Sequence, residues 1–315
     1  MDKTYCDNCE EPGHLKKNCT SLPKANLVAA QSKNGKDFEF REPLSDVNVV
    51  DTHCHIDALF ERIRHRGNYE QFKTLFRFPP NVRGCISSFS DPTCFGSLGM
   101  WESLFSEDGV WGTFGVHPHS AKYYNDELEA KIVACLKHPK ALAVGECGLD
   151  YSVRSASPKD KQDIAFKRQL RIAVQLDKPV VIHCREAETD CFQIMKDILP
   201  SDWKIHLHCY TGDLAQAEEY SSHFPNLYFG VTNLVTYPTA TQVHHDATDL
   251  PLRKLVLETD APYFVPSRLK GTTRFSTPGM VMYVAGKLAE FHKCSLDKVL
   301  ETCQKNAENL YGISF

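Results

Sequence analysis

The stretch Asp51-Thr52-His53-Cys54-His55 directly follows the short apolar run Val47–Val50 and decides how the rest of the chain is interpreted. Residues two apart on an extended chain point to the same side. His53 and His55 are therefore expected to approach a single metal ion. An apolar run that ends in two imidazoles predicts a buried strand with a metal site at its carboxyl end.

Seven further apolar runs of similar length follow, with longer segments of helical spacing between them. They are Gly84–Phe89, Val110–Gly115, Ala141–Gly145, Pro179–His183, Lys204–His208, Leu227–Val231 and Leu255–Glu258. The clearest helical segment is Asp160–Leu176, where Ile164 and Leu170 are expected on one buried side. Strands that alternate with helices imply parallel pairing with right-handed crossovers. A doubly wound open sheet remains open on this pattern, but eight units favour an α/β fold closed into a (β/α)8 TIM barrel.

Polar side chains also stand at the ends of the later predicted strands. In chain order they are His117, His119, Glu146, His183, His208 and Asp260. The carboxyl ends of barrel strands meet at one mouth, so these groups are expected to converge there. A mixed nitrogen and oxygen ligand set suits Zn²⁺ or Mn²⁺ and tolerates Mg²⁺. Two imidazoles from the first strand, two more from the fifth and sixth, and two carboxylates from the fourth and eighth make six ligands. Six are too many for one tetrahedral ion, so two ions sharing a carboxylate are expected, an arrangement that suits displacement at phosphorus.

The remaining histidines receive a simpler interpretation. A lone histidine at a strand end is more often a hydrogen-bonded structural residue than a ligand. His138, His206, His223 and His292 have no supporting pattern around them and are expected to be structural.

Six blocks of sequence occur in order between Val50 and Tyr311. They are Asp51-Thr52-His53-Cys54-His55, Gly115-Val116-His117-Pro118-His119, Gly145-Glu146-Cys147-Gly148-Leu149-Asp150-Tyr151, Ile182-His183-Cys184-Arg185-Glu186-Ala187, His208-Cys209-Tyr210-Thr211-Gly212 and Glu258-Thr259-Asp260-Ala261-Pro262-Tyr263. Together they resemble the signature blocks of the TatD-related deoxyribonucleases, most closely the animal branch. The resemblance implies a TIM barrel of the metal-dependent hydrolase, or amidohydrolase, type. It also implies that His53, His55 and Asp260 hold one ion, that Glu146 bridges, and that His183 and His208 hold the other.

The same resemblance implies an activity: Mg²⁺-dependent cleavage of DNA, often from the 3′ end, with Mn²⁺ or Zn²⁺ as alternative ions. Asp260 and Glu146 would be the catalytic carboxylates, with Asp260 orienting a metal-activated water and taking its proton. His117, His119 and Arg185 match positions that would contact phosphate. For Arg185, pairing with a nearby acid such as Glu186 or Glu188 is an equal alternative. The expected substrate is DNA, RNA or both, as single strands or ends.

A separate pattern lies near the start of the chain. Cys6-x2-Cys9-x4-His14-x4-Cys19 has the spacing of a retroviral-type CCHC zinc knuckle, and three thiolates with one imidazole would hold a structural Zn²⁺. We therefore expect a knuckle at 1–22, a flexible linker at 23–46 and the barrel at 47–315. The knuckle would bind single-stranded nucleic acid or dock another protein, and its acidic residues weaken the first reading.

Composition and charge bound the alternatives. The net charge of −4 argues against a broadly basic surface for nucleic acid, so bound metal ions would have to attract a polyanionic substrate. No apolar run approaches the length of a membrane span and no secretory signal is visible, so the cytosol or nucleus is expected. Two other functions stay open: an amidohydrolase-type small-molecule hydrolase or deaminase, and a noncatalytic protein that binds nucleic acid.

Overall fold

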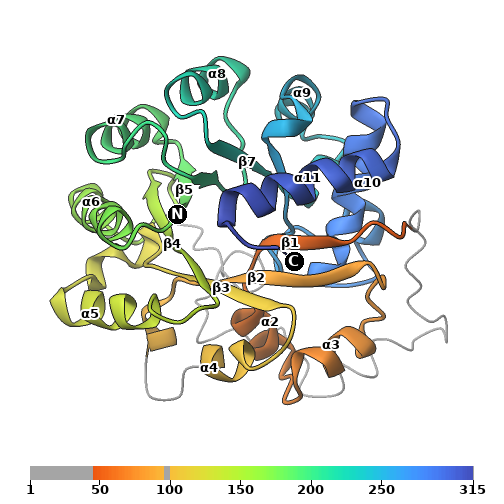
Figure 1. The fold of residues 1–315 in the computed structure, drawn as a ribbon, viewed down its shortest axis with the longest axis horizontal. Coiled ribbons are helices and arrows are strands. Elements are labelled where there is room, and N and C mark those ends of the chain that lie inside the picture. Colours follow the sequence, from red (N-terminus) through yellow and green to blue (C-terminus); the bar gives the residue numbers. More distant parts are fainter. Residues whose placement is uncertain (1–44, 96–99, 315) are drawn as a thin grey trace, which may run out of the picture. The chain divides into compact units, whose positions relative to one another are not determined.

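The barrel predicted from the strand pattern is confirmed. A computed structural model describes residues 45–95 and 100–314, which lie within a compact unit spanning Phe40–Phe315. Each strand pairs in parallel with the next along the chain (Figure 1). The strands are β1 Val49–Cys54, β2 Val82–Phe89, β3 Val110–Phe114, β4 Ala141–Asp150, β5 Val180–Arg185, β6 Ile205–Leu207, β7 Leu227–Val231 and β8 Leu255–Leu257. All eight correspond to predicted runs. The longest departure is β4, which extends five residues past the predicted end at Gly145.

The seam between β1 and the chain after β8 is joined by hydrogen bonds rather than by regular strand pairing. The Asp260 amide donates to the His53 carbonyl at 2.9 Å, and the His55 amide donates to the Ala261 carbonyl at 2.7 Å. The carboxylate of Asp51, which is fully buried, accepts from the Thr259 amide at 2.9 Å and from its hydroxyl at 2.5 Å. The seam therefore lies beside the predicted metal ligands His53, in β1, and His55, just after it, and beside Asp260, which follows β8.

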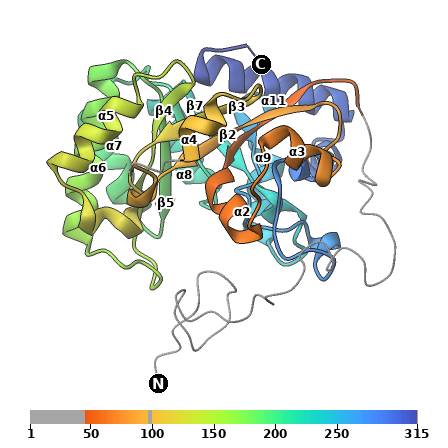
Figure 2. The same cartoon turned by 90° about the horizontal axis from the view of Figure 1, so that it is seen from below.

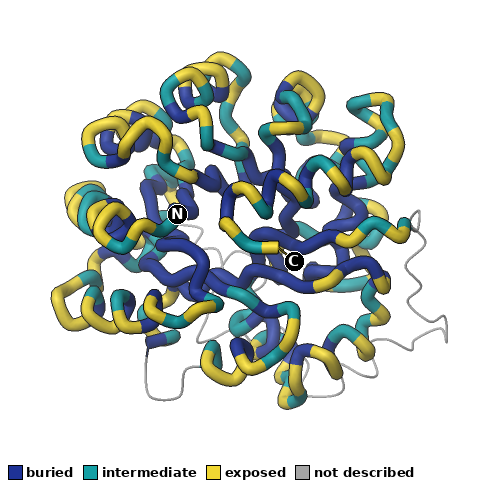
Figure 3. The backbone as a smooth tube through the Cα atoms, viewed as in Figure 1, coloured by how far each residue is buried: buried dark blue, intermediate teal, exposed yellow. Residues whose placement is uncertain are grey.

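Helices cover the outside of the strands. They are α2 Ile56–Ile63, α3 Tyr69–Leu75, α4 Met100–Phe105, α5 Asp126–Cys135, α6 Lys159–Leu176, α7 Glu188–Ile198, α8 Leu214–His223, α9 Thr241–Asp249, α10 Val281–Phe291 and α11 Leu296–Tyr311. Their inner faces and the strands are buried, while their outer faces are exposed (Figure 3). None of the helices in the described part of the chain is long and apolar enough to cross a membrane.

The predicted helix at Asp160–Leu176 is confirmed as α6, and Leu170 is buried as expected, but Ile164 is not. Ile164 is 51% exposed, whereas Gln162 and Gln169 are buried. The Gln162 side chain accepts from the Asp150 amide at 2.8 Å and donates to the Asp150 carbonyl at 2.9 Å. The Gln169 carbonyl likewise accepts from the Val116 amide at 2.6 Å. These two amides satisfy backbone groups beside the barrel mouth, so polar residues occupy positions that an apolar pattern cannot reveal.

Helix α11 closes the end of the barrel opposite the polar strand ends. Its residues Ala307, Leu310 and Tyr311 form a buried cluster with strand residues that include Val50 and Val181, both near the beginnings of their strands. Figure 2 shows α11 along one end of the strands and α2, which follows the carboxyl end of β1, toward the other. The barrel therefore has an apolar floor made by α11 and a polar mouth.

The predicted zinc knuckle at 1–22, with Cys6, Cys9, His14 and Cys19, lies outside the described residues. The predicted linker lies outside them too, except for its last two residues.

Candidate metal centre

Four predicted ligands meet at the mouth of the barrel. The Nε2 atoms of His53 and His55 are 3.3 Å apart. The Glu146 Oε2 atom lies 3.5 Å from the first nitrogen and 3.7 Å from the second. The Asp260 Oδ1 atom lies 3.7 Å and 3.2 Å from the same two nitrogens. The ligand atoms of His53, His55 and Glu146 thus form one candidate ion site, and Asp260 from the segment after β8 lies beside its two imidazoles.

These four atoms fit a divalent ion. Around a tetrahedral Zn²⁺ with ligands at roughly 2.0–2.1 Å, neighbouring ligand atoms are about 3.3–3.4 Å apart, and the five distances above run from 3.2 to 3.7 Å. Glu146 Oε2 and Asp260 Oδ1 are buried and have no hydrogen-bond partner among the described residues. Buried carboxylate oxygens are otherwise costly without a partner. Their lone pairs are therefore free for a cation.

The other oxygen of Glu146 faces three more imidazoles. Glu146 Oε1 lies 2.9 Å from His183 Nδ1, 3.5 Å from His117 Nε2 and 3.7 Å from His208 Nε2. His183 and His208 were predicted to share an ion, yet their ring centroids are 6.2 Å apart. The close ligand atoms group His183 with His117 and Glu146, and His208 with His53 and Glu258. Glu146 therefore spans two ligand groups, as a bridging carboxylate requires. His117 was expected only to contact phosphate, but it lies in one of these groups.

The far nitrogen of three of these imidazoles meets an acceptor. His55 Nδ1 lies 3.1 Å from the Ser88 carbonyl, and His183 Nε2 lies 3.1 Å from Asp150 Oδ2. His208 Nδ1 lies 3.2 Å from Glu258 Oε1. In the neutral ring such an acceptor favours the tautomer with the proton on the far nitrogen, so the near nitrogen can offer a lone pair to a metal.

His117 has the opposite arrangement. Its Nδ1 atom accepts the backbone N–H of His119 at 3.1 Å. In the neutral ring the proton must then sit on Nε2, the atom that faces Glu146. His117 therefore points a donor into the mouth, which suits an anionic group better than a metal ion.

Burial and charge at the mouth favour cations. Burial lowers the pKa of His53 to about 4, with His208 as the next cause. For His55, burial acts in the same direction, but the Asp260 and Glu146 carboxylates prevail and raise its pKa to about 9. Burial is likewise outweighed at His208, where Glu258, Asp260 and Glu146 raise the pKa to about 10. The carboxylates thus create a negative potential that protons or metal ions can satisfy.

Two buried carboxylates were not predicted as site residues. Asp150, the last residue of β4, lies 2.9 Å from His119 Nε2 and 3.1 Å from His183 Nε2, and it is fully buried. Glu258 is also fully buried and lies against His208. Both stand in the sequence blocks at strand ends. The spacing of these blocks does not distinguish a residue that binds a metal ion from one that only contacts a metal-binding residue.

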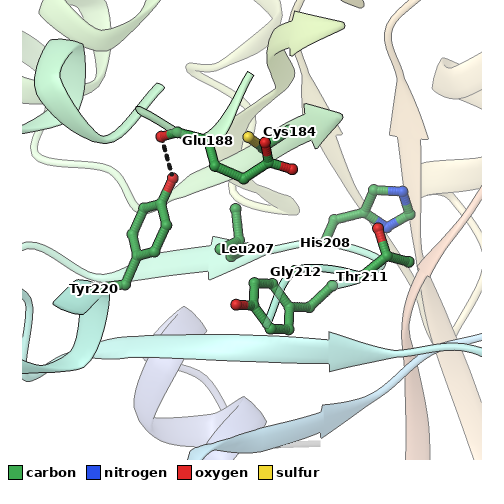
Figure 4. Close-up of a pocket in the computed structure, with 8 residues that line it drawn as sticks. Cys184, Glu188, Leu207, His208, Thr211, Gly212 and Tyr220 are labelled. Carbon is green, nitrogen blue, oxygen red and sulfur yellow. Dashed lines mark hydrogen bonds between the residues drawn. The ribbon is translucent and has the colours of Figure 1, made fainter. Parts of the chain in front are cut away.

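Two features at the mouth face outward. Tyr263, also missed as a site residue, is 41% exposed, and its ring lies 6.0 Å from that of His55. Arg185 ends β5 half-buried and, within residues 45–95 and 100–314, forms no ion pair with Glu186 or Glu188. A small pocket adjoins His208 and is lined by Cys184, Glu188, Leu207, Tyr210, Thr211, Gly212 and Tyr220 (Figure 4).

His206 confirms the structural interpretation given from the sequence. It is fully buried, and its two ring nitrogens lie 2.8 Å from Glu258 Oε2 and 2.8 Å from the Tyr311 hydroxyl.

Comparison with known proteins agrees with this arrangement. Residues 50–312 match the family model described as TatD related DNase. The human protein named 3′-5′ RNA nuclease TATDN2 is 38% identical over 297 residues, which cover 93% of this chain but only 37% of that protein. The Escherichia coli K12 protein named 3′-5′ ssDNA/RNA exonuclease TatD is 32% identical over 208 residues, covering 65% of this chain and 79% of its own length.

Solved structures share the fold. The TatD homologue YJJV of Escherichia coli K12 superposes with a TM-score of 0.74 at 24% identity, covering 85% of this chain and all of that one. A TatD-family hydrolase of Entamoeba histolytica gives 0.70 at 19% identity, with coverage of 85% and 99%. At these identities the likeness concerns the barrel alone.

Proposed function

The chain belongs to the TatD-related DNase family, and on that premise we propose that it is a divalent-metal-dependent nuclease that removes nucleotides from the 3′ end of single-stranded DNA or RNA. One observation carries the proposal. Two buried carboxylate oxygens, on Glu146 and Asp260, have no hydrogen-bond partner within residues 45–95 and 100–314 and face the Nε2 atoms of two adjacent imidazoles. The names of the human and bacterial relatives support the choice of a nucleic-acid substrate and the 3′→5′ direction.

We assign the metal ligands as the sequence blocks suggest. His53, His55 and Asp260 would hold one ion, His183 and His208 the other, and Glu146 would contribute one oxygen to each. Mg²⁺ is the proposed physiological ion, with Mn²⁺ or Zn²⁺ as substitutes. Bound ions of this kind lower the pKa of water and neutralise charge on a phosphodiester.

The chain's own side chains supply the remaining steps. Asp260 would accept a proton from the attacking water, since its carboxylate lies at the mouth, 3.2 Å from His55 Nε2. His117 would donate from Nε2 to a phosphate oxygen, because its Nδ1 atom already accepts from the His119 amide. Arg185, which pairs with neither neighbouring acid, would bind a second phosphate oxygen. His119 lies against Asp150, and this contact would orient its ring for a contact with phosphate.

The parts outside the described residues complete the proposal. Cys6, Cys9, His14 and Cys19 would bind a structural Zn²⁺, and the knuckle would recruit single-stranded nucleic acid or a protein partner. We place the protein in the cytosol or nucleus. The spacing of the three cysteines and the histidine supports the proposed zinc site.

End-labelled oligonucleotides test the activity. Single-stranded DNA and RNA, labelled at the 3′ or 5′ end, are incubated with wild type in Mg²⁺, Mn²⁺ or EDTA. Metal-dependent shortening from the 3′ end is expected, with loss of activity in Asp260→Ala. Asp202→Ala, which replaces an exposed acid in the turn before β6, at the end of the barrel opposite the mouth, is the control and should cleave normally. Turnover of a small amide or ester without cleavage of either polymer would instead favour the small-molecule hydrolase.

A further inference from the structure

A buried polar path runs beneath the metal centre. His206 precedes His208 by two residues near the end of β6, so both side chains point to the same side of the strand. The His206 Nε2 atom lies 2.8 Å from Glu258 Oε2, and His208 Nδ1 lies 3.2 Å from Glu258 Oε1. One carboxylate thus contacts two imidazoles, one of which faces the mouth.

The path continues to the floor of the barrel. The other nitrogen of His206, Nδ1, lies 2.8 Å from the hydroxyl of Tyr311, which also donates to the Thr52 carbonyl at 3.4 Å. Tyr311 is the last residue of α11, and its ring packs in the cluster that closes the barrel floor. A continuous row of contacts therefore links α11, through the interior, to His208.

The surrounding backbone leaves room for this carboxylate. A Cβ atom added at Gly230 on β7 would lie 2.5 Å from Cδ and from both oxygens of Glu258. Glu258 Oε1 also accepts the Cys209 amide at 2.6 Å. His206 and Glu258 are fully buried, and Tyr311 is 5% exposed. Burying a carboxylate costs several kcal/mol unless it is paired, so three polar partners at this depth form a built arrangement rather than a surface contact.

We propose that Glu258, His206 and Tyr311 are positioning residues that fix the ring plane and tautomer of His208 for metal binding. This inference rests on the proposed metal centre. Glu258 has two oxygens: one faces His208, and the other forms an ion-pair contact of 2.8 Å with His206 Nε2 that lies outside hydrogen-bond geometry. The opposite nitrogen of His206 is hydrogen-bonded to Tyr311. Without this row the carboxylate can turn away and His208 can rotate. Removing such outer partners typically weakens metal affinity about 10–100-fold.

Mn²⁺ titration of the metal-free full chain tests the proposal. Tyr311→Phe removes one hydroxyl and keeps the ring, and we expect it to weaken Mn²⁺ binding about 10-fold while the thermal midpoint changes little. His206→Gln should weaken binding at least as much. The matched control is Leu310→Ala, which disturbs the same apolar cluster without touching the polar row. It should lower the thermal midpoint yet leave the Mn²⁺ affinity of the folded protein within about twofold.

Cleavage assays separate this proposal from the proposed function. With Mg²⁺ at a fixed subsaturating level, Tyr311→Phe should lower kcat with little change in KM for the oligonucleotide, and excess Mg²⁺ should restore it. Wild-type Mn²⁺ affinity in Tyr311→Phe, or equal weakening in Leu310→Ala, overturns the positioning role even if the enzyme cleaves nucleic acid. Weakened Mn²⁺ binding in Tyr311→Phe, in a wild type that cleaves no oligonucleotide, upholds the positioning role and overturns only the nuclease.

Discussion

Metal binding at the barrel mouth should release protons at neutral pH. The pKa of His55 is raised to about 9 and that of His208 to about 10, because neighbouring carboxylates outweigh burial. At pH 7 both rings are then about 99% protonated or more in the metal-free protein. A metal ligand must be a neutral imidazole. Each ring therefore has to lose a proton when the ions bind.

The number of protons follows from the same groups. His53, whose pKa is lowered to about 4, is already neutral at pH 7 and contributes none. Glu146 is already an anion, because neighbouring imidazoles, His117 foremost, keep its pKa well below the usual range in spite of burial. His183, whose pKa is raised by Asp150 and Glu146 against burial, contributes a further fraction. Full loading should release about two protons and no more than about three.

Calorimetry in several buffers measures this number directly. Mn²⁺ is titrated into EDTA-stripped protein at pH 7 in buffers with different ionisation enthalpies, and the slope of observed against buffer enthalpy gives the protons released. The apparent affinity for the loaded pair should rise about 100-fold per pH unit between pH 6 and pH 8. In His208→Gln the release should fall by about one proton. A slope near zero in wild type would refute the reasoning, since the two rings would then be neutral before metal arrives.

Three further predictions follow from the fold and the site. Gly145→Ala should destabilise the protein by at least about 2 kcal/mol more than Gly271→Ala. A Cβ at Gly145 (φ 140°) would clash with the Val181 carbonyl, whereas nothing lies within 4 Å of a Cβ at Gly271 (φ 88°). Urea unfolding compares the two variants, and equal losses of stability would contradict the steric argument. Tyr263→Ala should weaken oligonucleotide binding about 10–100-fold through lost base stacking, while Tyr263→Phe should bind normally. Fluorescence anisotropy in the inactive Asp260→Ala background measures the affinity. An unchanged affinity in Tyr263→Ala would show that Tyr263 does not contact the oligonucleotide. The metal-free protein should lose stability as pH rises from 6.5 through about 9, on the order of 3 kcal/mol for His55 alone. The sign follows because the pKa of His55 is raised in the folded state, so its contribution to stability is complete below pH 6.5 and is lost as the pH rises through about 9. Thermal melts measure this, and a melting temperature that stays constant or rises over this pH range would contradict the prediction.

The sequence predicted the barrel and the ligand types because both depend on local patterns. A buried parallel strand reads as an apolar run, and the carboxyl ends of barrel strands meet at the mouth, so His53, His183 and Asp260 were expected there from the sequence. The helix α6 was likewise predictable from its length. The burial of Leu170 followed from the same pattern, but that of Gln162 and Gln169 did not, because these side chains are buried to bond backbone groups of β4 and of the segment after β3.

Roles that depend on side-chain contacts could not be predicted. His206 and His208 both lie near the end of β6, and only the distances to Tyr311 and Glu146 show that one faces the floor and the other the mouth. The difference between His117 and the metal-facing imidazoles rests on a single backbone N–H, that of His119. Asp150 was out of reach because β4 runs five residues further than its apolar run.

The seam between the first and last strands gives the metal centre a second consequence. Asp51 and Thr259, whose contact holds this seam, are 208 residues apart in the chain. His53, His55 and Asp260 flank it, so an ion held by these three residues would act as a cross-link that closes a very long loop. In a chain-entropy picture a covalent closure of a 100-residue loop stabilises by about 4.7 kcal/mol, and longer loops gain slightly more. A circular permutant that joins β8 directly to β1 would shorten that loop to a few residues. The ion would then contribute much less to folding, although the same atoms would bind it.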